Sequence, residues 1–187
     1  SVAGPPPAVT VPAATHEPDT PAGLAAFTAA EACFATIQDW LDGADSSALD
    51  HGELEAQLDT RGRELLRQLL QDHLELRAVR EDRIVVHDSD GARRTRTEAG
   101  HARVLATIFG EVTVTRLAYR APGAANLHPA DAVLNLPTEK HSHGLRQVAA
   151  IESSRGSFEG AVDAIERASG QHLGKRQVED LAGRAAV

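Results

Sequence analysis

Apolar residues recur at helical spacing in two long stretches before residue 82. The first runs from 22 to about 42 and carries the stripe Phe27, Ala30, Phe34, Ile37 and Leu41. The second runs from about 50 to 82 and is rich in Leu, and residues 43–47 form a break between the two. Spacings of three and four residues place such side chains on one face of a helix. We therefore expect two helices, the second of them long.

The Leu-rich helix carries apolar residues on two faces, and Gly62 and Asp72 interrupt a clean heptad repeat. A helix of this kind is either packed between other elements of its own domain or paired with a second chain. Both interpretations stay open, and the second predicts a homodimer formed through the 50–82 helix.

Three shorter helical stripes follow one another between 141 and 187. Their apolar positions are Leu145, Val148 and Ala149, then Phe158, Ala161, Val162 and Ile165, then Val178, Leu181, Ala182 and Ala185. Ser157 stands at the N-cap position of the second stripe, and Gly170 stands where a helix stop with positive φ is expected. Short helices joined by a tight Gly-containing turn are typical of a helix-turn-helix. We therefore predict a three-helix, helix-turn-helix-like bundle over 141–187 as the DNA-binding region.

Between these helical parts the apolar pattern changes to a period of two. The run RIVVHDSDGARRTRTE predicts two short strands joined at the Asp90-Gly91 turn, and HARVLATIFGEVTVTRLAYR predicts a second hairpin around Phe109-Gly110. We thus expect two small antiparallel β-hairpins over 83–120. A loop-rich connector over 121–140 carries the last three prolines.

Taken together, the patterns predict an α+β chain that is mainly α. Residues 1–23 hold six of the nine prolines, so we expect a disordered, extended arm there, since Pro suits neither a helix interior nor a central strand. Residues 24–82 form the helical region, to which we assign assembly. Aromatic residues make up only 3% of the chain, so Leu, Val, Ile and Ala must build the core.

The charge of the chain is unevenly distributed. The net charge of −8 argues against a generally basic nucleic-acid binder. However, residues 1–60 contain ten acidic residues and no Lys or Arg, whereas residues 61–120 contain twelve Arg and nine acidic residues. Six of these arginines lie on the predicted strands: Arg93, Arg94, Arg96, Arg103, Arg116 and Arg120. They are candidates for contacts with a phosphate backbone.

The last predicted helix opens with polar side chains that could contact DNA. The candidates are Lys175, Arg176 and Gln177 at its first turn and Arg184 on its outward face. A helix-turn-helix presents that turn to the major groove, where Lys and Arg bind guanine or phosphate and Gln reads adenine. Against this, Glu179 and Asp180 would repel phosphate. Intrahelical ion pairs from Arg176 through Asp180 to Arg184 are the alternative.

Two other polar motifs have a structural and a chemical interpretation. Asp88 and Asp90 could belong to an Asp-dependent phosphatase or nuclease, but a hairpin turn explains them better because no matching Lys or helix follows. His141 and His143 could bind a metal, but a metal site needs a third ligand. Asp163 and Glu166 fit a solvated helix face. The chain has no phosphate-binding loop or nucleophile motif, so we expect no enzymatic activity from it alone.

Several features indicate a cytoplasmic protein. Cys33 is the only cysteine, so no internal disulfide can form. No apolar run approaches the ~20 residues of a membrane-spanning helix, and there is no secretion signal. Because the chain begins at Ser1 and contains no Met, we expect a trimmed product, a start at a non-Met codon or a piece of a longer reading frame.

Longer motifs point to one family. The runs FGEVTVTRLAYRAPG, ADAVLNLPTEKHSHGLRQVAAIE, SFEGAVDAIERASG and GKRQVEDLA, in this order, resemble the N-terminal half of ISKra-family insertion-sequence transposases. The likeness extends from about Leu24 to the C-terminus and includes the helix GRELLRQLLQDHLELRAVRE and the DG-containing hairpin.

This resemblance implies a bacterial mobile-element protein that acts in DNA transposition, a form of DNA recombination. Such a protein binds the double-stranded DNA ends of its insertion sequence. Cutting and joining would be done by an RNase H-like domain with an acidic triad and a divalent metal, expected to be Mg²⁺. That domain would follow Val187, so no carboxylate and no cofactor of this chain is assigned to the reaction. The chain would be the DNA-recognition and assembly part.

Overall fold

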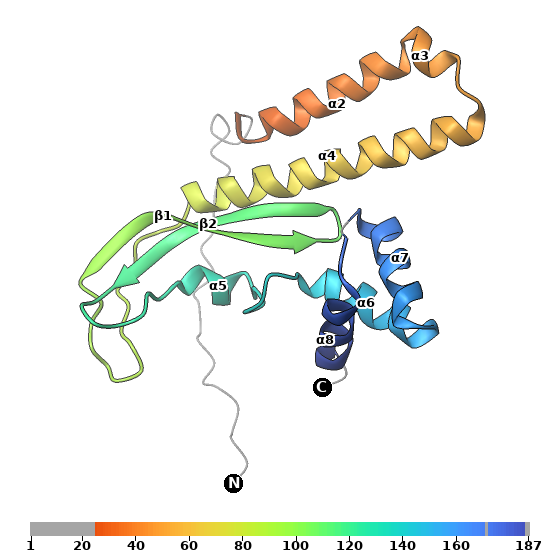
Figure 1. Cartoon of the computed structure of the whole chain (residues 1–187). Helices are drawn as coiled ribbons and strands as arrows, with labels where there is room; N and C mark the ends of the chain where they lie inside the picture. Colours follow the sequence, from red (N-terminus) through yellow and green to blue (C-terminus); the bar gives the residue numbers. More distant parts are fainter. Residues whose placement is uncertain (1–24, 171, 186–187) are drawn as a thin grey trace.

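The computed structural model describes residues 25–170 and 172–185, so the predicted Pro-rich arm lies outside the described residues. The elements are η1 (Ala25–Phe27), α2 (Thr28–Leu41), α3 (Ala44–Ser47), α4 (His51–Val79), β1 (Arg96–Thr107), β2 (Gly110–Arg120), α5 (Pro129–Val133), α6 (His143–Arg155), α7 (Phe158–Ser169) and α8 (Lys175–Ala185). A long helical hairpin lies over a β-hairpin, and α6, α7 and α8 gather near one end of it (Figure 1). The predicted fold class, α+β and mainly α, is confirmed.

The long helix α4 begins at a capping box and is not interrupted. The Asp50 carboxylate accepts the Glu53 N–H at 2.8 Å, and the Glu53 carboxylate accepts the Asp50 N–H at 3.1 Å. This reciprocal pair satisfies two backbone donors at the helix start. The helix then continues through Gly62 to Val79, while the short α3 fills the predicted break before it.

Asp72 explains how α2 is joined to α4. Its side chain is only 3% exposed, and its Oδ2 accepts the Ala30 N–H at 2.9 Å. Gln68 donates to its Oδ1 at 2.7 Å. The N-cap residue of α2, Phe27, makes no side-chain cap of its own, so Asp72 caps α2 from the neighbouring helix.

The second predicted hairpin is present and longer than predicted, whereas the first is reduced to a turn with one isolated antiparallel bridge and no regular strands. Arg96 pairs with Arg120 at the far end of the β1–β2 ladder, with a register shift between Glu98 and His101. The turn at Asp90-Gly91 is present, but only the isolated bridge between His87 and Arg93 flanks it. The register shift is a β-bulge, and beyond it residues 96–98 continue to pair with β2. These residues therefore belong to β1 and not to a separate hairpin.

The outer edge of β2 is covered by side chains of α4 and by the connector. Thr113 donates its N–H to Gln71 Oε1 at 2.8 Å, and Gln71 Nε2 donates to the Thr113 carbonyl at 3.2 Å. Tyr119 exchanges two backbone hydrogen bonds with Leu127. An amide side chain thus replaces a neighbouring strand, which protects the edge. Beneath it lies a small core of Leu74, Leu105, Val112 and Val114.

The predicted three-helix bundle is confirmed. Its core consists of Leu145, Ala149, Ala161, Ile165, Leu173, Val178 and Leu181, together with Ala106 from β1. Ser157 caps α7 by accepting the Gly160 N–H, and Gly170 ends it with a φ of 65°. Ala106 also exchanges backbone hydrogen bonds with Lys140 and Ser142, so the bundle is attached to the hairpin. None of the described helices is long and apolar enough to span a membrane.

Candidate nucleic-acid interface

The first turns of α7 and α8 are held together by an ion pair. Lys175 Nζ lies 2.9 Å from Glu159 Oε1, and both side chains are exposed. The hydrogen bond from Lys175 holds the pKa of Glu159 below its ordinary value, and the same contact raises the pKa of Lys175. Both groups are therefore charged at neutral pH, and the ion pair is lost as the pH falls through the lowered pKa of Glu159. Lys175 is thus already paired with an acidic side chain.

Gln177 has a capping role in this structure. Its Oε1 accepts the Gly174 N–H at 2.9 Å, which satisfies a backbone donor just before α8. The residue is exposed, so the contact fixes the side chain at the surface of the first turn. A base contact by Gln177 would have to use the amide nitrogen or break this cap.

Arg176 is the predicted base-contacting residue with the fewest constraints. It is exposed at the first turn of α8, and it makes no hydrogen bond or ion pair with any side chain that the structure describes. Glu179 and Asp180 are exposed on the next turn, so the helix presents both signs of charge. Arg184 belongs to α8, but its side chain lies outside the described part.

Two of the predicted strand arginines are held inside the protein. Arg94 is 9% exposed, donates to the Ala125 carbonyl at 3.1 Å, and lies 3.5 Å from Asp88. Arg116 is also 9% exposed and forms a close ion pair with Asp131. Both guanidinium groups are buried and lie beside an acidic side chain, so they are not available to DNA. We therefore remove Arg94 and Arg116 from the predicted DNA-contacting set.

The remaining strand arginines divide into two groups. Arg103 is half-buried and donates to the main-chain carbonyl of Glu139, so it joins β1 to the connector. Arg93 and Arg96 are exposed at the opposite end of β1 from the bundle. Arg120, also on that end, is paired with Glu98, whose pKa it lowers. Arg93 and Arg96 are therefore the candidates left for contacts with a phosphate backbone.

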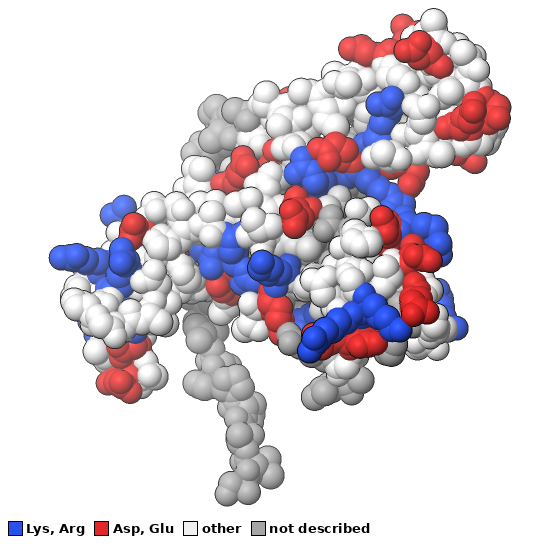
Figure 2. Space-filling model, in the orientation of Figure 1, with Lys and Arg blue, Asp and Glu red and all other residues white. Residues whose placement is uncertain are grey.

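The surface charge is mixed over the face that Figure 2 shows. Lys and Arg side chains form small separate groups, and Asp and Glu side chains lie between them. The candidates at the start of α8 and those at and just before the start of β1 lie near opposite ends of the hairpin (Figure 1). They do not form one compact site, so simultaneous contacts would require a DNA segment that spans the molecule.

The polar motifs with a catalytic interpretation make local structural contacts. Asp88 accepts the N–H groups of Asp90 and Ala92 at 3.1 and 2.9 Å, which is the hydrogen bonding of an Asx-type turn. This agrees with the turn interpretation. His143 Nε2 lies 2.9 Å from the Asn135 carbonyl, and Glu166 pairs with His172.

The metal that the transposase resemblance implies has no match in these residues. Within 25–170 and 172–185, no group of three or more His, Cys, Asp or Glu side chains is arranged to hold a metal ion. We therefore assign no metal-dependent step to them.

Several residues that organise this region could not be found from local patterns. Glu159 reaches Lys175, which lies sixteen residues away, and Asp131 reaches Arg116 from the connector. Only the fold brings these partners together. The chain matches no protein-family model, and no curated protein or solved structure is significantly similar to it.

Proposed function

We propose that this chain is the DNA-recognition and assembly region of a bacterial ISKra-type insertion-sequence transposase, and that it works in the cytoplasm. Its ligand is the double-stranded DNA at the ends of the element. The main support for this proposal is that the two motif runs SFEGAVDAIERASG and GKRQVEDLA fold as a short helix, a Gly-containing turn and a second helix. The second helix opens with an exposed arginine.

In this proposal Arg176 contacts base edges or phosphates at the start of α8. Arg93 and Arg96 contact the phosphate backbone from the other end of β1. Lys175 adds a phosphate contact by exchanging Glu159 for DNA. Such an exchange costs little, because both side chains are exposed and water and salt screen an ion pair of this kind.

A mobility-shift titration on the element's terminal repeats tests this proposal. Binding should be tighter than to a scrambled duplex of equal length, and it should weaken steeply with salt as counterions are released. Equal affinity for the two duplexes at moderate salt would contradict specific recognition.

Substitution of Arg176 gives the first prediction. Arg176→Ala should weaken binding to the terminal repeats by about tenfold, the usual loss for one good side-chain contact to a base. The matched control is Arg155→Ala, because Arg155 is exposed at the end of α6 and paired with Glu152. Equal losses for both variants would show that only general charge matters and would remove Arg176 from the recognition site.

A further inference from the structure

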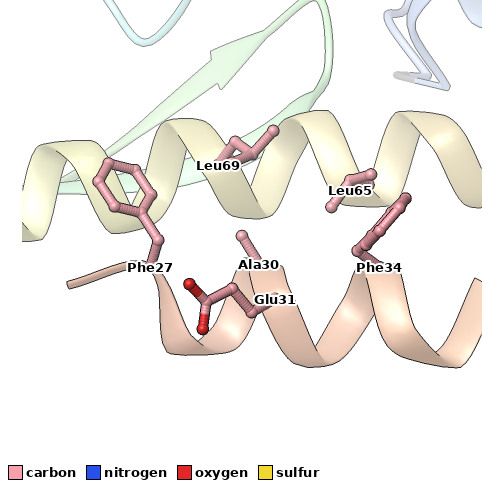
Figure 3. A pocket seen from close by; sticks show the side chains of 6 residues that line it. All are labelled: Phe27, Ala30, Glu31, Phe34, Leu65 and Leu69. Carbon is pink, nitrogen blue, oxygen red and sulfur yellow. The ribbon is translucent and has the colours of Figure 1, made fainter. Parts of the chain in front are cut away.

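The helical hairpin of α2 and α4 leaves a large amount of apolar surface exposed. The exposed fractions are 50% for Phe34, 42% for Leu41, 41% for Leu58, 45% for Leu66 and 39% for Leu69. Between the two helices lies a shallow apolar groove lined by Phe27, Ala30, Phe34, Leu65 and Leu69, with Glu31 beside it (Figure 3). Contiguous exposed apolar surface of this kind marks an interaction site.

One row of α4 beside this groove has an ordered pattern of charge. Its members follow one another at spacings of three and four residues, so they share one face of the helix. In chain order they are Glu55, Asp59, Gly62, Leu66, Leu69, His73 and Arg77. All are exposed except the half-buried Gly62. The row is therefore acidic at its start, apolar in the middle and basic at its end.

The row is symmetric in charge about its centre. Glu55 and Arg77 lie equally far from Leu66 along the helix, and so do Asp59 and His73. A second α4 running in the opposite direction would place acidic residues beside basic ones at both ends. A parallel partner would place Glu55 beside Glu55, which costs energy. The face is thus complementary to itself in one orientation only.

We propose that a second copy of this chain docks on this face with its α4 antiparallel, so that the twofold axis passes near Leu66. Leu66 then meets its own copy, and Glu55 of each chain lies opposite Arg77 of the other. Gly62 has open space where a Cβ would stand, which allows a close helix approach near the axis. Such an interface is isologous and closes after two chains.

The local ion pairs on this row do not prevent the arrangement. Asp59 pairs with Arg63 at 2.8 Å, and Glu55 lies 3.6 Å from His51. Glu55 and His51 are well exposed, so their contact is weak and can be exchanged at an interface. With 29 residues, α4 is about 43 Å long, which is enough length for a standard interface together with the flanking groove.

This inference is independent of the DNA-binding proposal, and its test uses the full chain without DNA. Sedimentation equilibrium should show a species of twice 19.8 kDa at protein concentrations from about 1 to about 100 µM, where modest interfaces associate. A monomer throughout this range would overturn the proposal, and so would a larger open assembly.

The decisive variant is Leu66→Glu, which places two like charges at the twofold axis and should give a monomer. Its matched control is Ile151→Glu on α6, because Ile151 is 41% exposed and Leu66 is 45% exposed. The control should remain a dimer, and circular dichroism should show unchanged helix content in both variants. If both variants have the same mass, the proposed face is wrong, because Leu66 then matters no more to association than Ile151 does.

A charge exchange tests the antiparallel orientation. Arg77→Glu should raise the dimer Kd by about tenfold, since the twofold axis repeats each lost contact. Adding Glu55→Arg to the same chain should restore most of the affinity. If the double variant is as weak as the single variant, the antiparallel register is wrong.

Discussion

Asp72 places a carboxylate where the heptad pattern of α4 calls for an apolar side chain. It is buried, and its two oxygens accept one backbone N–H of α2 and one amide N–H of Gln68. The positive end of the α2 dipole adds to the stabilisation of its charge. A residue that interrupts the sequence pattern is therefore the residue that fixes where α2 begins.

Removing this carboxylate should destabilise the protein by about 1–3 kcal/mol, because Asp72→Ala leaves a buried backbone donor without its acceptor. Asp72→Asn keeps an acceptor oxygen and should lose less. Urea unfolding at low protein concentration measures both. The control is Asp163→Ala, an exposed acidic residue of α7, which should change stability by less than about 0.5 kcal/mol. A similar loss for Asp72→Ala and Asp163→Ala would contradict the capping role.

The arginines show what could and could not be predicted at the scale of residues. Their place in the strand-like part of the chain could be predicted from the sequence, and Arg93 and Arg96 are indeed exposed. The burial of Arg94 and Arg116 was not visible, because it depends on partners that the fold supplies. Asp131 meets Arg116 from a connector whose path has no periodic signal. Charge patterns along the chain therefore locate arginines but do not show which of them are free to bind a ligand.

At the scale of elements, helices were more predictable than strands. The helical stripes, the Ser157 cap and the Gly170 stop are local features, and the structure contains all of them. The sequence analysis placed residues 96–98 in the first hairpin, whereas they belong to β1. A bulge and the end of a strand both interrupt the alternation of apolar and polar residues, so the sequence alone does not distinguish them. Strand pairing is a contact between distant residues, so the length of the ladder depends on Arg120 as much as on Arg96.

Gln71 joins two elements by taking the place of a strand. Gln71→Ala should lower stability by about 1–2 kcal/mol and speed hydrogen exchange at the Thr113 amide, because that N–H loses its acceptor. Exchange measured by NMR or mass spectrometry checks the local effect, and urea unfolding checks the global one. Gln147→Ala on α6 is the control, since Gln147 is exposed and should leave Thr113 protected. Unchanged exchange in Gln71→Ala would show that α4 does not hold this edge.

At the scale of the whole molecule, the tip of the β-hairpin lies between the two helical parts. A Cβ on Gly110 would lie 2.9 Å from the Arg67 side chain of α4, and Ile108 lies close to Gly144 of α6. The neighbouring Thr107 hydroxyl donates to the Gly110 carbonyl at 2.7 Å. The hairpin therefore connects the face proposed for self-association with the bundle proposed for DNA contact.

Gly110→Ala tests the backbone conformation at the tip of the hairpin. Gly110 has a φ of +127°, so the substitution should cost about 1–3 kcal/mol through backbone strain. The loss should persist in an Arg67→Ala background, which removes the contact but not the strain. Gly183→Ala is the control, because open space surrounds that helical glycine and Ala should stabilise the helix by up to about 1 kcal/mol. Thermal unfolding measures all of them, and no loss in Gly110→Ala would refute the strain.

The cap that Asp72 provides also sets an order of events during synthesis. The 14 residues of α2 leave the ribosome before residue 72 does, and a helix of this length is only marginally stable alone in water. Its first turn cannot be completed until α4 has emerged and folded back against it. α2 therefore becomes stable only after the second long helix is made, and it is held in place by a residue translated long after it.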